Sequence, residues 1–196
     1  MLYQNEAEFR KEYSLIAGID EAGRGPLAGP VVAAAVILPS DLKIKGLQDS
    51  KKLTPLKREK LYHAITSLAV AWSIGAASAE MIDRINILQA TLHAMLKAAS
   101  RLQHNPGLFL IDGNQAPAGL PSPTICCIKG DANYASIAAA SIIAKVTRDR
   151  IMFNLDRLYP LYSWKKNKGY PTLEHRQAIT MFGITPFHRK TFHLLS

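Results

Sequence analysis

The feature that most constrains the fold is a pair of short apolar segments joined by a glycine-rich loop. Residues 15–20 (LIAGID) and 30–38 (PVVAAAVIL) are typical of buried strands and too short to span a bilayer. The loop between them, 21–29 (EAGRGPLAG), allows the backbone to approach a ligand closely and offers a guanidinium to a phosphate. The segment therefore predicts two buried strands connected by a ligand-binding loop.

The rest of the chain alternates between strand-like and helix-like patterns. Thr54-Pro55 is a favourable helix start, and small alanine side chains at 135–140 suit close packing of a helix on a sheet. The predicted strands are 15–20, 30–38, 69–77, 108–112 and 124–128, and the predicted helices are 56–67, 86–103, 134–158 and 172–181. This order predicts one α/β domain over residues 1–196, built around a mixed sheet.

Charge and cysteine content narrow the functional classes. The 24 basic and 15 acidic residues give a formal net charge of +9, which favours a polyanionic partner, nucleic acid first. Residues 1–14 carry no apolar core or cleavage pattern, so we expect neither a signal peptide nor a membrane partner. The adjacent Cys126 and Cys127 lack disulfide or metal-site spacing and are expected to be reduced and buried, which predicts a cytoplasmic protein.

Four acids stand at strand ends or before a helix: Asp20, Glu21, Asp112 and Asp131. Carboxylate oxygens favour Mg²⁺ or Mn²⁺ over zinc, and two such ions roughly 4 Å apart suit phosphodiester hydrolysis. Neighbours on a regular strand point to opposite faces, so the strand is expected to end or bulge at Glu21. Taken singly, each acid is more typical of a cap or a turn.

The glycine loop shares some features with a dinucleotide-binding fingerprint. Gly23, Gly25 and Gly29 follow a strand, but their spacing is G-x-G-x-x-x-G and Pro26 follows the second glycine. A second strand-like run comes next, where the fingerprint needs a helix. The sequence therefore does not predict a dinucleotide-binding site.

Three basic segments are candidates for contact with a polyanion. Lys51 and Lys52 precede a predicted helix, and Ser141, Lys145 and Arg148 fall on one side of another. The segment 165–170 (KKNKGY) combines lysines with Tyr170, which suits phosphate contact plus stacking. A solvated charged face is the competing interpretation of each segment. The roles of His175, His188 and Arg189 stay open.

Six segments together resemble the bacterial ribonuclease HII family. They read GIDEAGRGPLAGPVVAAAVIL (18–38), DSKKLT (49–54), LIDGN (110–114), KGDANYASIAAASIIAKVTRDR (129–150), NKGYPTLEH (167–175) and FHRKTF (187–192). The resemblance implies a ribonuclease H-like α/β fold with a C-terminal helical segment. It also implies cleavage of RNA paired with DNA, including incision on the 5′ side of a single ribonucleotide in duplex DNA, which leaves 3′-hydroxyl and 5′-phosphate ends.

The resemblance also implies roles for individual residues. The metal-binding catalytic carboxylates would be Asp20, Glu21, Asp112 and Asp131, holding Mg²⁺ or Mn²⁺. Gly23, Arg24 and Gly25 would recognise the ribose 2′-hydroxyl and a phosphate, while Tyr170 would pack on the sugar at the RNA–DNA junction. Supporting substrate contacts would come from Lys51, Lys52, Ser141 and Lys145.

The same residues distinguish the chain from related families and other functions. Ribonuclease HIII usually carries a glutamate as its fourth acid and an extra N-terminal domain, so Asp131 and the early motif favour HII. The implied protein is a monomer whose partners are RNA–DNA hybrids and ribonucleotide-containing duplexes. Residues 192–196 show no recognisable sliding-clamp motif, so no clamp partner is expected. The alternatives are a non-catalytic hybrid-binding protein and a nuclease for all-deoxy DNA.

Overall fold

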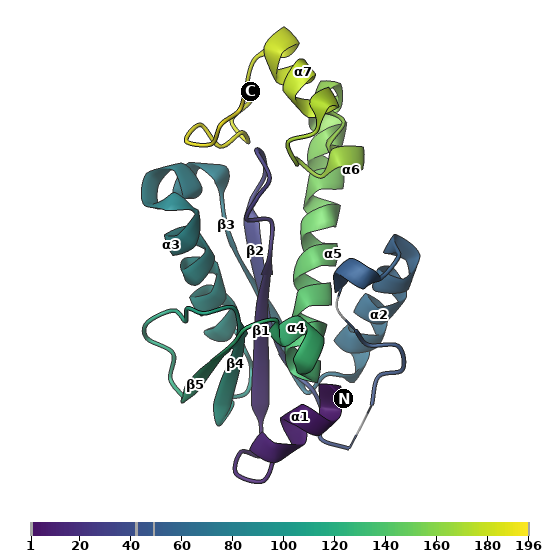
Figure 1. Cartoon of the computed structure of the whole chain (residues 1–196), viewed down its shortest axis with the longest axis vertical. Helices are drawn as coiled ribbons and strands as arrows, with labels where there is room; N and C mark the ends of the chain where they lie inside the picture. The colour runs from purple at the N-terminus through teal and green to yellow at the C-terminus, as the bar shows by residue number, and fades with distance from the viewer. Residues whose placement is uncertain (1, 42, 49, 196) are drawn as a thin grey trace.

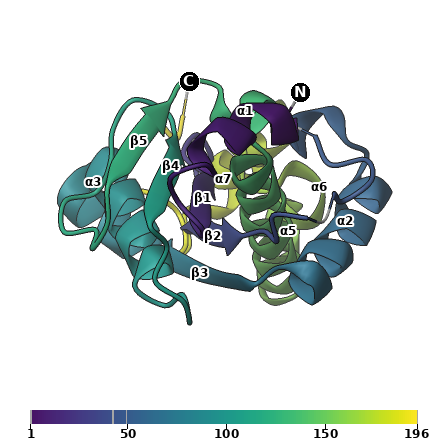
Figure 2. The ribbon, with the colours of Figure 1, turned by 90° about the horizontal axis from the view of Figure 1, so that it is seen from below.

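The computed structural model describes residues 2–41, 43–48 and 50–195, without the side chain of Lys52. These residues form a five-stranded sheet in the order β3-β2-β1-β4-β5 (Figures 1 and 2). β2 pairs antiparallel with β1 and β3, whereas β4 pairs parallel with β1 and β5, so the sheet is mixed as predicted. The strands are β1 (Ile16–Ala22), β2 (Val31–Ile37), β3 (Ala71–Ala77), β4 (Leu108–Asp112) and β5 (Thr124–Cys127).

Helices cover both faces of this sheet. Figure 2 shows α3 and α5 on opposite faces of the sheet. Every residue of β2 is buried because alternate side chains contact α3 on one face and α5 on the other. The helices are α1 (Leu2–Phe9), α2 (Pro55–Leu68), α3 (Ala79–Ala99), α4 (Gly130–Asn133), α5 (Ala135–Leu158), α6 (Trp164–Asn167) and α7 (Leu173–Phe182), with 3₁₀ turns η1 (Ser50–Lys52) and η2 (Pro160–Tyr162). No helix among the described residues is long and apolar enough to cross a membrane.

A glycine on each face of the sheet allows a helix to approach closely. A Cβ added to Gly18 of β1 would lie 2.1 Å from the carbonyl carbon of Ser136 in α5. A Cβ added to Gly75 of β3 would lie 2.1 Å from the carbonyl oxygen of Ala94 in α3. Both distances are far below van der Waals contact, so these positions fix the spacing between sheet and helices.

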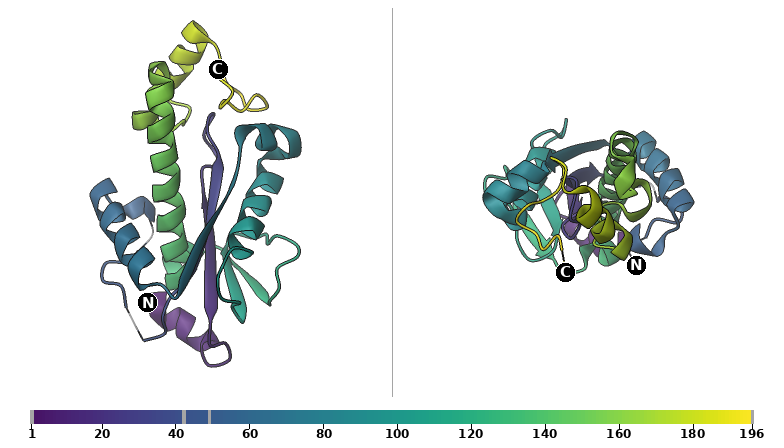
Figure 3. Two further views of the ribbon diagram at one scale, coloured as in Figure 1. Left: turned by 180° about the vertical axis from the view of Figure 1, so that it is seen from behind. Right: turned by 90° about the horizontal axis from the view of Figure 1, so that it is seen from above.

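The C-terminal part of the chain packs beyond one end of the sheet. α5 extends past the strands, and α6 and α7 pack around its far end (Figures 1 and 3). A separate core cluster holds them there, centred on the fully buried Trp164 with Met152 and Ile179. The last segment then returns to α3, where Asp83 accepts hydrogen bonds from the backbone N–H groups of Lys190 (2.9 Å) and Thr191 (3.0 Å). This return carries residues 187–192 back toward the loop after β1.

One predicted helix start and one predicted environment were wrong, and one short helix was not predicted. α3 begins at Ala79 and not at 86, because the Ser78 side chain caps it by accepting from the Met81 N–H (3.1 Å). Asn86 interrupts the helix with φ 66°, which explains why the sequence pattern starts there. The first lysines of the basic segment 165–170 lie in the one-turn helix α6, for which no helix was predicted. Cys127 is buried as expected, but Cys126 is exposed because β5 is the edge strand.

The close approach at Gly18 yields a stability prediction. We expect Gly18→Ala to lower the free energy of unfolding by roughly 3 kcal/mol, because the added methyl group meets the backbone of α5. Urea unfolding monitored by circular dichroism measures the effect. The control is Gly25→Ala, whose Cβ would lie 3.9 Å from Tyr170 Cε1, in ordinary contact. Equal losses in the two variants would show that Gly18 does not limit the packing of α5.

Candidate active site at the ends of β1 and β4

Two adjacent strand ends bring carboxylates together. β1 and β4 run parallel with Ile19 opposite Ile111, so the next residues, Asp20 and Asp112, lie at the same edge of the sheet. Asp131 stands in the first turn of α4, shortly after β5. Ligand oxygens of Asp20, Asp112 and Asp131 all lie within 4.8 Å of one another. The structure thus gathers three of the four predicted acids into one cluster, which we call the carboxylate cluster.

Hydrogen bonds and an ion pair fix each member of the carboxylate cluster. The Glu21 N–H donates to Asp20 Oδ1 at 2.6 Å, and the Gly130 N–H donates to Asp112 Oδ1 at 2.7 Å. Lys51 Nζ pairs with Asp131 Oδ2 at 3.1 Å. The three carboxyl groups are therefore positioned by the backbone and by a basic residue from η1 before any ligand binds.

Burial and mutual repulsion both oppose ionisation of the carboxylate cluster. Asp20 is 4% exposed, and burial raises its pKa well above the ordinary value, with repulsion from Glu21 and Asp112 adding to the shift. Burial also raises the pKa of Asp112. A divalent cation would remove this repulsion, and clustered carboxylate oxygens are ligands that Mg²⁺ and Mn²⁺ prefer. The residues present therefore fit a hard divalent metal ion.

Glu21 reaches the site from the other face of the strand, and the expected bulge is absent. β1 pairs with β2 in regular register as far as Ala22 opposite Val32, so the prediction that the strand ends or bulges at Glu21 was wrong. The pairing of β1 with β4 stops at Ile19, however. Beyond that point no strand among the described residues pairs with this side of β1, and Glu21 lines the same pocket as Asp20.

That pocket collects most of the other predicted site residues. Its volume is about 250 Å³, and it opens beside the carboxylate cluster. The predicted residues that line it are Asp20, Glu21, Gly23, Arg24, Gly25, Lys51, Asp112, Ser141, Lys145 and Tyr170. The Lys52 side chain lies outside the described part of the structure, as does Asp49 of the same motif. Asp131 does not line the pocket itself but lies next to it through its contacts in the carboxylate cluster.

A fully buried arginine from the C-terminal return holds the glycine loop from behind. Arg189 donates through Nη2 to the carbonyl oxygen of Gly23 (2.6 Å) and through Nη1 to that of Arg24 (2.9 Å). Its Nε and Nη2 also donate to the carbonyl oxygen of Gly29, at 3.1 and 2.9 Å. One planar guanidinium thus fixes three carbonyl groups of the loop at once.

A second buried arginine from α5 supports the other side of the loop. Arg148 is 1% exposed and donates to the carbonyl oxygens of Ala28 (3.0 Å), Pro30 (3.0 Å) and Lys168 (2.9 Å). A Cβ on Gly23, where φ is 98°, would lie 2.1 Å from Arg148 Nε. The expected polyanion contact of Arg148 was therefore wrong, because its donors face the protein interior.

The arginine contacts determine which way the loop amides point. A trans peptide places the carbonyl of one residue opposite the N–H of the next, and no described peptide bond is cis. Since the carbonyls of Gly23 and Arg24 face Arg189, the N–H groups of Arg24 and Gly25 point away from it. Neither N–H donates to an acceptor among the described residues. The loop consequently offers two adjacent, fixed hydrogen-bond donors.

Two buried histidines extend this support to Tyr170. The Thr185 N–H donates to His188 Nδ1 (2.9 Å), so the proton of His188 lies on Nε2, which faces His175 Nε2 at 3.2 Å. His175 Nε2 also accepts from Trp164 Nε1 (3.0 Å), which leaves His175 Nδ1 to donate to the Tyr170 carbonyl (3.0 Å). This single consistent set of tautomers makes both rings neutral and fixes the backbone of Tyr170.

Sequence reasoning left the supporting residues without roles. His175, His188 and Arg189 lie in segments that the resemblance matched. The loop partners of Arg189 are up to 166 residues away along the chain, and the two histidines contact each other across 13 residues. The one available signal was the grouping of histidine and arginine in 187–192 (FHRKTF), which does not reveal the partner.

Comparison with known proteins agrees with this site. A family model described as Ribonuclease HII matches residues 17–195. The ribonuclease HII of Enterococcus faecalis is 56% identical over 187 residues, which cover 95% of this chain and 72% of that protein. The chain belongs to the ribonuclease HII family. It is accordingly a hydrolytic endoribonuclease with an acidic metal-binding cluster.

Solved structures support the same assignment for the fold. Ribonuclease H2 from Pyrococcus horikoshii is similar with a TM-score of 0.77 and 30% identity, covering 92% of this chain and 94% of that one. Ribonuclease HII of Archaeoglobus fulgidus, solved as a complex with PCNA, has a TM-score of 0.75 and 26% identity, covering 91% and 95%. The predicted ribonuclease H-like fold with C-terminal helices is thus confirmed.

The neutral histidine pair predicts how stability depends on pH in this ribonuclease HII. Burial, with repulsion from His175, lowers the pKa of His188 to about 4, from an ordinary 6.5. The unfolded chain therefore binds a proton that the folded chain excludes, so stability is full above pH 6.5 and falls as the pH drops toward 4. We expect a loss on the order of 3 kcal/mol from this group.

Urea unfolding at several pH values measures this loss, with His188→Gln as the control. The Gln amide can still donate to His175 but does not titrate. The difference between the wild-type and variant unfolding free energies should therefore change with pH between 6.5 and 4. Parallel curves over that interval would mean that His188 is not kept neutral by the fold.

Proposed function

We propose that this ribonuclease HII cuts the phosphodiester bond on the 5′ side of a ribonucleotide within duplex DNA, and also cuts the RNA strand of RNA–DNA hybrids. One observation carries the proposal: Asp20 and Asp112 of the carboxylate cluster line the same pocket as Tyr170 and the loop residues Arg24 and Gly25, whose N–H groups have no acceptor among the described residues. Such a pocket combines a place for hydrolysis with groups that distinguish ribose from deoxyribose.

The carboxylates would hold the metal. We propose Asp20, Glu21, Asp112 and Asp131 as ligands of Mg²⁺ or Mn²⁺, two ions being the arrangement expected for phosphodiester hydrolysis. When bound, the ions would lower the pKa of an attacking water and offset charge that develops on the phosphate. The hydrogen bonds to Asp20 and Asp112 leave one oxygen of each carboxylate without these donors, available as a ligand.

The loop would select the sugar. The N–H groups of Arg24 and Gly25 would donate to the ribose 2′-hydroxyl and the neighbouring phosphate, with the half-exposed Arg24 guanidinium adding charge. Tyr170, 39% exposed, would pack on the sugar at the junction. Its ring already lies 5.9 Å from Lys145 Nζ, so stacking and charge would act together on the strand.

The remaining expectations follow from the same site. Lys51, Lys52, Ser141 and Lys145 would make supporting contacts with the substrate. Ser141 is held for this by a hydrogen bond of 2.8 Å between its Oγ and that of Ser50.

We propose that residues 1–196 act as one catalytic unit and as a monomer, in the cytoplasm.

A cleavage assay tests the proposed reaction. The substrate is a labelled DNA duplex with one internal ribonucleotide, and the control is the all-deoxy duplex of the same sequence. We expect a single metal-dependent cut on the 5′ side of the ribonucleotide and no cut in the control. Chelation or the substitution Asp20→Asn should lower the rate at least about a thousandfold, because several kcal/mol of transition-state stabilisation are lost.

Three results would contradict the proposal: cleavage of the all-deoxy duplex, cleavage in the presence of chelator, or near wild-type cleavage by Asp20→Asn with Mg²⁺ present. Running the assay separately in Mg²⁺ and Mn²⁺ identifies the preferred ion. Anisotropy of the same duplex with Asp20→Asn checks that the variant still binds, so that the loss belongs to the chemical step.

A further inference from the structure

A basic groove lies beside the active-site pocket, between α2, α5 and α6. Its volume is about 650 Å³, which exceeds that of the pocket itself. Five cationic side chains line it, against two acidic ones, Glu59 and Asp149. The five are Arg58, Lys145, Arg150, Lys166 and Lys168. The excess of positive charge favours an anionic occupant.

The groove and the active-site pocket share a wall. Lys145 lines both cavities, because its position on α5 lies between them. A strand that places a phosphate at the carboxylate cluster can therefore continue past Lys145 into the groove. This continuity links the groove to the substrate of the proposed reaction.

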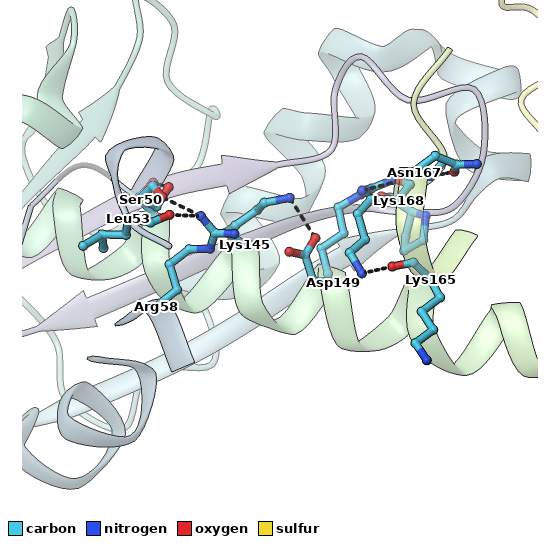
Figure 4. Close-up of polar contacts among 12 residues, drawn as sticks. Ser50, Leu53, Arg58, Lys145, Asp149, Lys165, Asn167 and Lys168 are labelled. Atoms are coloured by element: carbon cyan, nitrogen blue, oxygen red, sulfur yellow. Dashed lines mark hydrogen bonds and ion pairs between the residues drawn. The ribbon is translucent and has the colours of Figure 1, made fainter. Parts of the chain in front are cut away.

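Several of the cations are held in place by the protein, as Figure 4 shows. Arg58 donates to the carbonyl oxygens of Ser50 (3.0 Å) and Leu53 (2.6 Å), and Lys168 donates to that of Lys165. Arg150 lies over the ring of Tyr62, 4.3 Å from its centroid. Anchored cations lose less conformational freedom when they bind a phosphate than free ones do.

The two acids do not cancel this charge. Asp149 pairs with Lys145 at 2.8 Å, and Glu59 pairs with Arg150. Three further cations line the groove beyond these two pairs, one of which, Lys166, pairs at 3.1 Å with Glu174 on α7. The pairs of Arg150 with Glu59 and of Lys166 with Glu174 are exposed and contribute little stability, so a phosphate can replace their acidic partners at small cost.

The length of the groove suits a nucleic-acid backbone. Its wall on α5 runs from Lys145 to Asn154, about 13 Å at 1.5 Å per residue. One DNA strand carries a phosphate about every 3.4 Å along the helix axis, so roughly four phosphates span this distance. The cations stand on three sides of the groove, on α2, on α5 and in or just after α6, which suits a chain of phosphates better than one small anion.

We propose that this groove binds the phosphate backbone of the duplex on one side of the ribonucleotide. The inference rests on the proposed function, since it takes the same duplex as substrate. It assigns Arg58, Arg150 and Lys166, none of which lines the active-site pocket, to the flanking duplex.

A binding experiment with chelator present tests the groove. Fluorescence anisotropy measures the affinity for a one-ribonucleotide duplex at several salt concentrations, for wild type and for the double variant Arg150→Gln/Lys166→Gln. We expect the variant to bind on the order of tenfold more weakly at 0.1 M salt. The slope of log K against log salt should become shallower by about 1.8, for two lost phosphate contacts.

Two controls make the result specific to the groove. The variant Lys11→Gln/Arg101→Gln removes the same charge from exposed residues outside the groove and should bind as wild type. Two shortened duplexes, each lacking the arm on one side of the ribonucleotide, locate the contact. The loss in Arg150→Gln/Lys166→Gln should disappear with one of them and persist with the other.

The outcomes separate this inference from the proposed reaction. A wild-type chain that binds but does not cut the duplex would contradict the reaction and leave the groove in place. A wild-type chain that cuts, with an unchanged salt slope in the double variant, would overturn the groove alone. Equal losses in both double variants, or with both shortened duplexes, would also overturn it, and an absence of duplex binding by wild type would overturn both.

Discussion

The site depends on two buried guanidinium groups that hold the loop after β1 by its carbonyl oxygens. Neither Arg148 nor Arg189 forms a salt bridge with a carboxylate among the described residues, so backbone carbonyl groups accept all of their hydrogen bonds. Burial lowers their pKa values, to about 10 for Arg148 and about 9 for Arg189, and both stay protonated at neutral pH. A buried charge is tolerated only when its hydrogen bonds are satisfied, so the loop and the arginines fix each other.

This constraint links distant parts of the chain to one small pocket. Arg189 reaches the loop because the C-terminal segment returns to α3 through Asp83, and Arg148 reaches it from the end of α5 that extends past the sheet. The buried His175 and His188 then fix the backbone of Tyr170, whose ring lies beside Gly25 of the loop. The C-terminal helices therefore act as the support of the active site, although none of the carboxylates lies in them.

Much of this arrangement could be predicted from the sequence, for reasons of local chemistry. Apolar runs and strand-end acids gave the strands and placed Asp20 and Asp112, and motif resemblance gave the family. The regular strand at Glu21 could not be predicted. It depends on where β4 stops pairing with β1, at Ile19 opposite Ile111, which leaves that side of β1 uncovered beyond this point. Nor could the burial of Arg148 be predicted, since its acceptors are carbonyl groups that any residue supplies.

The most direct test of the central claim uses Arg189→Lys, which keeps the charge but cannot reach three carbonyl groups at once. In chelator, one measures the affinity for a one-ribonucleotide duplex and for the matched all-deoxy duplex, in variants shown to be folded. Wild type should bind the one-ribonucleotide duplex up to roughly tenfold more tightly than the all-deoxy duplex, because about one additional hydrogen bond forms. In Arg189→Lys this preference should approach one, with the affinity for the all-deoxy duplex kept within about twofold. A folded variant that keeps the full preference would contradict the claim that Arg189 sets the loop for recognising the ribose.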